Sequence, residues 1–246
     1  MKDIIAFWGY PNKNLIKKTK EKYPSATWVD LDIDFKAPDI KAVPDNYCVI
    51  IKNIFNNAYN LKDRIIKILA PIGKDKCDSA YFASEILKEE GFNVIQSVFE
   101  DVCNSPLEVL QNKTPISVSA LPLKEKIELI TKNIVEEKDY SNLPKKEAQF
   151  GFWGVPPNDL GLLDLFPDGT EVFGWCRAVE AGYPGDFQIE HYVKKNLPTV
   201  FFTQAFCSKT QCARYLANKY EGLFIDVDVT PNASIRAKIE AFLKLR

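Results

Sequence analysis

Apolar and polar positions alternate along the first half of the chain in blocks whose lengths suit strands and helices in turn. Short apolar runs predict strands at residues 4–8, 27–33, 47–51 and 92–95. Stretches with apolar residues at helical spacing predict helices at residues 14–23, 61–69 and 79–90. Gly9 and Pro11 close the first run, because neither residue continues a strand ladder well.

The second half of the chain repeats this alternation. It predicts strands at residues 115–120, 149–153, 171–176, 198–202 and 223–229, and helices at 124–137, 187–195, 208–220 and the C-terminus. Strands that alternate with helices predict parallel sheets and an α/β fold. The polar stretch 141–148 predicts a linker between a first lobe, residues 1–140, and a second lobe, residues 149–246.

One motif occurs twice and predicts an internal repeat. Phe7-Trp8-Gly9-Tyr10-Pro11 returns as Phe152-Trp153-Gly154-Val155-Pro156, and each copy leads through an Asn to an aromatic-Pro corner and a second β-prone run. We therefore expect two similar Rossmann-like lobes with parallel sheets. Ligands of such sheets bind beyond the carboxyl ends of the strands, where both motif copies lie.

The repeated Trp-Gly pairs are accordingly candidate binding residues. Trp8, Gly9, Trp153 and Gly154 would lie at equivalent strand ends, where the two indole rings could stack on a flat ligand or simply pack in the core of each lobe.

Composition narrows the function classes. The chain of 246 residues has a formal net charge of -1, which provides no long-range field for nucleic acid or an anionic membrane. No apolar run reaches the ~20 residues that cross a bilayer, so we expect a cytoplasmic protein. Its expected partner is a small-molecule ligand, and it could form a homo- or hetero-oligomer. In that compartment the six cysteines are expected to be thiols, metal ligands or redox groups.

Acidic residues follow the second predicted strand. Asp30, Asp32 and Asp34 alternate, so they could share one face and bind Mg²⁺ or the hydroxyl groups of a ribose. The glycine-rich turn Gly-x-Gly-x-x-Gly that binds a dinucleotide pyrophosphate is absent after the first strand. Carboxylates that merely cap helices or face water are the alternative.

Three cysteines fall near predicted strand ends in the second lobe. Cys176 would end one strand, Cys207 would begin a helix after the next strand, and Cys212 lies one turn further on. Three thiolates could hold an iron-sulfur cluster, and two could form a redox pair. Small buried side chains on one helix are the alternative for Cys207 and Cys212.

About fifty residues at the C-terminal end of the second lobe form a sequence of elements that can be compared with a known family. They are Thr199-Val200-Phe201-Phe202, Phe206-Cys207, the strand Gly222–Asp228 and the helix Ile235–Leu243. This order resembles the C-terminal part of the 2-hydroxyacyl-CoA dehydratase family, which includes benzoyl-CoA reductase subunits. The resemblance implies a three-cysteine iron-sulfur cluster with Cys207 as one ligand.

Three functions remain open at this point. The chain could be an enzyme or enzyme subunit that binds a small molecule or cofactor in a cleft between the lobes, with an iron-sulfur centre for reductase or dehydratase chemistry. It could instead be a non-catalytic binding or scaffold protein with structural cysteines, or a thiol oxidoreductase.

Overall fold

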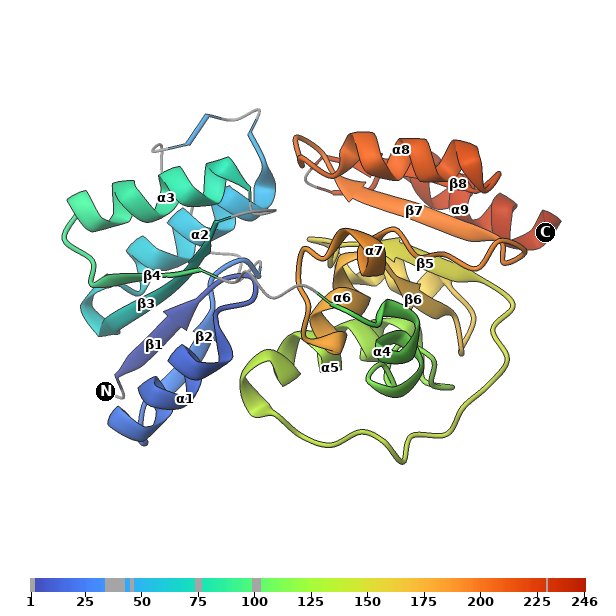
Figure 1. Cartoon of the computed structure of the whole chain (residues 1–246). Coiled ribbons are helices and arrows are strands. Elements are labelled where there is room, and N and C mark those ends of the chain that lie inside the picture. Colours follow the sequence, from blue (N-terminus) through green and yellow to red (C-terminus); the bar gives the residue numbers. More distant parts are fainter. Residues whose placement is uncertain (1–2, 34–42, 45–46, 74–76, 99–102, 229) are drawn as a thin grey trace. The chain divides into compact units, whose positions relative to one another are not determined.

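The fold was analysed in a computed structural model, which describes residues 3–33, 43–44, 47–73, 77–98, 103–228 and 230–246. The chain divides into two compact units, Met1–Glu100 and Asp101–Arg246 (Figure 1). The division differs from the predicted linker at 141–148, because the helix Leu123–Glu136 packs on elements of the second unit. No helix in the described ranges is long and apolar enough to cross a membrane.

The first unit is a four-stranded parallel sheet with helices between the strands. Its elements are β1 (Ile4–Phe7), α1 (Lys13–Lys22), β2 (Thr27–Asp30), α2 (Val49–Asn60), the 3₁₀ turn η1 (Lys62–Arg64), β3 (Ile65–Ile72), α3 (Asp78–Glu89) and β4 (Val94–Val98). The strand order is β2-β1-β3-β4. Figure 1 shows α2 and α3 side by side along one face of this sheet.

Apolar side chains on both faces of the strands form the core of the first unit. Ile4, Ala6 and Ile68 belong to one buried cluster with residues of α2 and α3. Ile5 and Phe7 alternate with them and are also buried, so both faces of β1 are covered.

The second unit contains another four-stranded parallel sheet and more helices. Its elements are α4 (Pro106–Asn112), α5 (Leu123–Glu136), β5 (Gly151–Gly154), the 3₁₀ turn η2 (Leu160–Leu165), β6 (Glu171–Phe173), α6 (Trp175–Ala181), α7 (Phe187–Glu190), β7 (Thr199–Gln204), α8 (Thr210–Lys219), β8 (Leu223–Val227) and α9 (Ala233–Leu245). The strand order is β6-β5-β7-β8. The protein is therefore α/β, with two four-stranded parallel sheets.

Aromatic residues dominate the core of the second unit. Trp153 and Phe201 pack on α8 on one face of the sheet. On the other face Phe152 packs on Phe166 and Phe202, with ring centroids 5.6 and 5.9 Å away. Such pairs are favourable because aromatic rings bury a large apolar area and attract each other edge to face or offset.

Two predictions in the first unit are wrong. The apolar run at 47–51 begins helix α2, not a strand, because Ile51, Ile54, Phe55 and Ala58 recur at helical spacing and all reach the core. The stretch 61–69 forms η1 and the first half of β3, not a helix. Its β-branched residues suit a strand in the middle of a parallel sheet.

Predictions in the second unit also needed correction. The predicted strand 171–176 ends at Phe173, since Gly174 adopts a φ of 72° and α6 starts at Trp175. The predicted helix 187–195 ends at Glu190. Residues 115–120 form turns with one antiparallel bridge, Ser119 to Lys145, instead of a strand.

The part-exposed Glu180 and the buried Lys126 hold that 115–120 segment. The Glu180 carboxylate accepts the N–H groups of Ile116 and Ser117 at 2.6 and 2.9 Å. The Lys126 ammonium donates to the carbonyls of Ser117 and Thr170 at 3.3 and 2.8 Å. Burial raises the pKa of Glu180 to about 7 and lowers the pKa of Lys126 to about 8, because it disfavours both charged forms.

A buried ion pair lies beside this segment. Arg177 and Glu171 are 5% and 2% exposed, and Nη1 of Arg177 lies 2.7 Å from Oε1 of Glu171. Arg177 also donates to Thr114 Oγ1 and the Leu110 carbonyl, and Lys194 pairs with the second oxygen of Glu171. The guanidinium thus links α4, β6 and α6.

Replacement of Arg177 by Met should strongly destabilise the second unit. Without Arg177, the buried Glu171 keeps only the half-exposed Lys194 as a partner, and the Leu110 carbonyl loses the guanidinium donor. Because breaking a buried pair is costly, we expect a loss of about 3 kcal/mol in the free energy of unfolding. Urea denaturation measures this loss. Lys138→Met breaks an exposed pair with Glu136 and should leave the unfolding midpoint almost unchanged. Equal effects of the two substitutions would contradict a structural role for the buried pair.

Candidate functional site

A pair of aspartates lies where the carboxyl ends of β1 and β2 meet. Asp30 is the last residue of β2 and pairs in register with Phe7 at the end of β1. The Gly9 N–H donates to Asp32 Oδ2 at 2.9 Å, and the Asp32 N–H donates to Asp30 Oδ1 at 3.3 Å. The turn after β1 and the loop after β2 are therefore joined through carboxylates.

Two asparagines of α2 hold the loop after β2 through hydrogen bonds to its carbonyl groups. The Asn53 side chain donates to the Asp32 carbonyl at 3.0 Å. The Asn57 side chain donates to the carbonyls of Leu31 and Ile33 at 2.8 and 2.7 Å. Both asparagines are buried, and a buried amide is favourable only when it is hydrogen-bonded. These bonds satisfy both buried amides and tie the backbone of residues 31–33 to α2.

Both carboxyl groups have raised pKa values. Each side chain is only part-exposed, and burial is the main cause of the raised pKa of Asp30 and of Asp32. The charge of Asp32 raises the pKa of Asp30 further, so Asp30 lies well above the ordinary aspartate range. Because two carboxylates this close resist ionising together, the pair favours sharing one proton.

The Trp8-Gly9 pair plays different roles in this arrangement. Trp8 is 3% exposed and belongs to the core of the first unit, so its ring offers no open face to a ligand. Gly9 supplies the N–H that binds Asp32 and adopts a φ of 54°, a conformation that glycine tolerates best. A Cβ at Gly9 would also lie 3.3 Å from Cγ of Pro71.

The equivalent pair in the second unit is wholly structural. Trp153 is fully buried and its indole N–H donates to the Glu190 carbonyl at 2.6 Å. A Cβ at Gly154 would lie 2.5 Å from the Phe202 carbonyl oxygen, so only glycine fits between the strands. A Cβ at Gly174 would lie 2.9 Å from the Gly154 nitrogen.

The three candidate metal ligands occupy unlike positions. Cys176 lies in the first turn of α6, fully buried, and burial raises the pKa of its thiol far above the usual range. Cys207 lies in the turn between β7 and α8, three residues before that helix starts. Cys212 lies within α8 beside His191. The predicted helix N-terminus at Cys207 and strand end at Cys176 are thus both incorrect.

No metal site is built from these residues. Among the residues that the structure describes, no group of three or more His, Cys, Asp or Glu side chains is placed to hold a metal ion. The predicted ligand set Cys176, Cys207 and Cys212 finds no support. Asp34, the third acidic residue of the predicted cluster, lies outside the described residues.

The sequence analysis did not predict the contact between Cys212 and His191. Cys212 Sγ lies 3.0 Å from His191 Nε2, although 21 residues separate the two in sequence. The single histidine of the chain cannot be told from a surface residue in the sequence, because the contact forms only when the residue after α7 lies against α8 in the fold.

A shallow hollow of about 340 Å³ lies elsewhere in the first unit. Its lining includes Tyr23 and Pro24, which precede β2, whereas Asp30 ends that strand. The hollow is therefore separate from the carboxyl pair.

Comparisons with known proteins do not assign the chain to a family. No family model matches it, and no curated protein matches it. Among solved structures it has a likeness to one described as the structure of MenH from S. aureus, with 13% sequence identity and a TM-score of 0.23, covering 98% of this chain and 93% of that one. A likeness at this level carries no conclusion about fold or function.

The carboxyl pair should make stability depend on pH in a defined direction. A raised folded-state pKa gives stability that is complete below the unfolded value and is lost as pH rises through the folded value. Asp30→Asn cannot ionise, so its urea midpoint should exceed that of the wild type at pH 7 to 8, and the gain should shrink towards pH 4.

Asp139→Asn is the matched control. Bonds from Ser141 lower the pKa of the exposed Asp139, so this substitution should give no gain at any pH. A midpoint of Asp30→Asn that stays below the wild-type midpoint from pH 4 to 8 would refute the proton-sharing pair.

Proposed function

We propose that the first unit binds a small ligand with neighbouring hydroxyl groups, such as the ribose of a nucleoside, at Asp30 and Asp32. The observation that carries this proposal is the part-exposed carboxyl pair with raised pKa values at the carboxyl edge of a parallel sheet. Ionisable groups with perturbed pKa values concentrate at functional sites.

The position of the pair supports a ligand site. In the order β2-β1-β3-β4 the chain leaves β1 to one side for β2 and returns to its other side for β3. Open parallel sheets bind ligands beyond the strand ends at such a reversal. In many dinucleotide-binding sheets an acidic residue at the end of the second strand binds the ribose hydroxyl groups. Asp30 occupies that position, 21 residues after Gly9.

The chemistry of the pair suits hydroxyl groups. A pair that shares one proton presents both a donor and several acceptors, and a ribose hydroxyl likewise both donates and accepts. The fixed backbone around Asp32 lowers the entropy lost on binding, because Asn53 and Asn57 already hold the loop in place.

The turn after β1 limits which part of a ligand this site can address. It contains Pro11 in place of the glycine-rich sequence, and Asn12 ties it to Ser97 and Val98 at the end of β4. Asn12 also caps α1 by accepting the Asn14 N–H. With one helix N–H already satisfied and no glycine-rich turn, the proposal concerns hydroxyl recognition and does not extend to a pyrophosphate.

We also propose that the two units are copies of one Rossmann-like ancestor. The two strand orders correspond, and the Trp-Gly pairs lie at the ends of corresponding strands. Phe7 pairs with Asp30 as Phe152 pairs with Val172, so Asp32 corresponds in register to Gly174. The Gly9 N–H meets the Asp32 carboxylate, and the Gly154 nitrogen faces the space beside Gly174.

Calorimetric titration with ribonucleosides and their 2′-deoxy forms tests the binding proposal. At least one of adenosine, guanosine, cytidine and uridine should bind, and loss of the 2′-hydroxyl should weaken binding about tenfold or more, since a hydrogen bond to a charged group contributes about 1.5–3 kcal/mol.

Variants connect that binding to the carboxyl pair. Asp32→Asn keeps an oxygen for the Gly9 N–H and should weaken the same nucleoside about tenfold, whereas Asp139→Asn should bind as the wild type does. The proposal fails if no ribonucleoside binds at millimolar concentration, or if the deoxy forms bind equally well.

A further inference from the structure

A thiol and an imidazole meet between α7 and α8 in the second unit. Cys212 Sγ lies 3.0 Å from His191 Nε2, and both side chains are part-exposed. His191 directly follows α7, and its ring lies 3.7 Å, centroid to centroid, from the ring of the exposed Phe187. Cys212 is therefore a thiol beside a proton acceptor within reach of solvent.

Charged groups surround this pair. Glu190 is 7% exposed; its Oε2 accepts from Lys209 Nζ at 2.5 Å, while its Oε1 has no hydrogen-bond partner among the described residues. Burial lowers the pKa of His191, with Lys209 and Lys219 acting in the same direction and Glu190 opposing them. Burial raises the pKa of Cys212 to about 11. The resting pair is accordingly a neutral thiol and a neutral imidazole.

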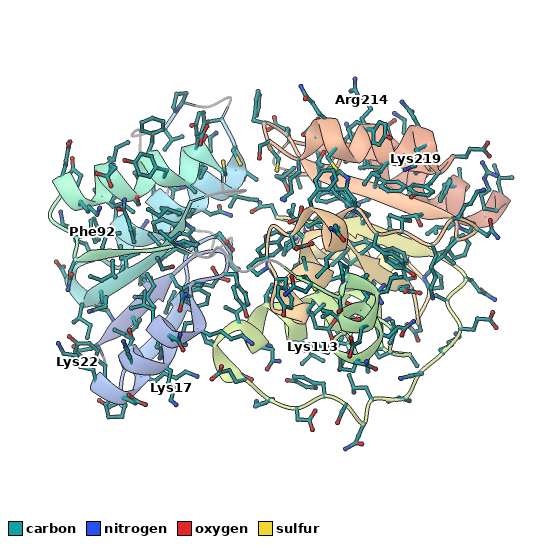
Figure 2. The ribbon with its side chains drawn as sticks, in the orientation of Figure 1. Lys17, Lys22, Phe92, Lys113, Arg214 and Lys219 are labelled. Atoms are coloured by element: carbon teal, nitrogen blue, oxygen red, sulfur yellow. The ribbon has the colours of Figure 1, made fainter. Side chains whose placement is uncertain are left out.

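Two lysines of this region act on the pair. The charges of Lys209 and Lys219 both lower the pKa of His191; Lys209 immediately precedes α8 and is bound to Glu190, and Lys219 ends the helix (Figure 2). The helix sequence Thr210–Lys219 contains no acidic residue. An anionic small molecule that approaches Cys212 from solvent is therefore attracted, at the range over which surface charges act.

We propose that Cys212 is a site of thiol-disulfide exchange with anionic low-molecular-weight disulfides, with His191 as the proton acceptor. Only residues of the second unit take part, so the inference is independent of the proposed ligand site in the first unit.

The exchange balances without any further reactant. As Cys212 Sγ attacks one sulfur of the disulfide, its proton moves to His191 Nε2 and a new S–S bond forms. The S–S bond of the small disulfide breaks, and its second sulfur leaves as a thiolate that takes the proton from His191. The disulfide is the oxidant: one of its sulfurs is reduced to a thiol, and Cys212 is oxidised to a mixed disulfide. The attacking species is the thiolate, and transfer of the Cys212 proton to His191 forms it within the pair at the moment of reaction.

Peptide mapping by mass spectrometry after exposure to glutathione disulfide tests the site. The full-length protein should acquire one mixed disulfide at Cys212 faster than at any other cysteine. Cys212→Ser should lose this adduct, whereas Cys207→Ser should keep it at the wild-type rate. His191→Gln should form it about a hundredfold more slowly, since general-base catalysis typically contributes about a hundredfold or more.

Charge provides a second readout that does not depend on His191. Glutathione disulfide should react with wild-type Cys212 faster than uncharged hydroxyethyl disulfide does, and Lys219→Gln should reduce that ratio. Urea denaturation confirms that the variants are folded. If His191→Gln proves unfolded, the ratio of the two reaction rates in Lys219→Gln, charged disulfide over uncharged disulfide, tests the proposal instead.

Three results would overturn the proposal. They are preferential modification of Cys207, an unchanged rate at Cys212 in folded His191→Gln, and a Cys207–Cys212 disulfide in place of the mixed disulfide. A ratio of charged to uncharged reagent that stays the same in Lys219→Gln would also overturn it, because the positive charge of Lys219 would then select nothing.

Discussion

The hydrogen bond from the Gly9 N–H to the Asp32 carboxylate joins the turn after β1 to the loop after β2. It depends on the positive φ of Gly9 and on a loop backbone that Asn53 and Asn57 hold from α2. The same bond keeps Asp32 near Asp30. Burial raises the pKa of both carboxyl groups and the charge of Asp32 raises the pKa of Asp30 further, whereas the Gly9 N–H lowers the pKa of Asp32. One hydrogen bond therefore fixes the position of the pair, and burial is the main cause of its raised pKa values.

In the second unit, apolar packing joins the strand ends and the helix that follows β6. Gly154 and Gly174 allow strand and helix to approach closely, and the fully buried Trp153 fills the space between the sheet and the adjoining helices. Its charged residues are placed elsewhere: the pair formed by Arg177 and Glu171 links buried elements. The two units thus differ beside their Trp-Gly pairs: a carboxyl pair lies beside Gly9 in the first unit, and Gly154 approaches Gly174 closely in the second.

The sequence predicted the α/β class, because alternation of strand-length apolar runs with helical stretches depends only on local pattern. The prediction failed where an apolar pattern suits a strand and a helix equally well. The run at 47–51 is such a case, and only the packing of Ile54 and Phe55 in the core shows that it is helical. Asp30 and Asp32 were predicted as a site from their position after a strand. The contact of Cys212 with His191 could not be predicted, since it joins a residue of α8 to the residue after α7, 21 positions earlier in the chain.

The shared proton of Asp30 and Asp32 is the central claim, and carbon NMR of the aspartate side chains measures it directly. The carboxyl carbons of both residues, assigned with Asp30→Asn and Asp32→Asn, are followed from pH 3 to 9. The account predicts that the two carbons titrate together in two steps, the later step well above the ordinary aspartate pKa of about 3.9. Two independent titrations near that ordinary value would contradict it.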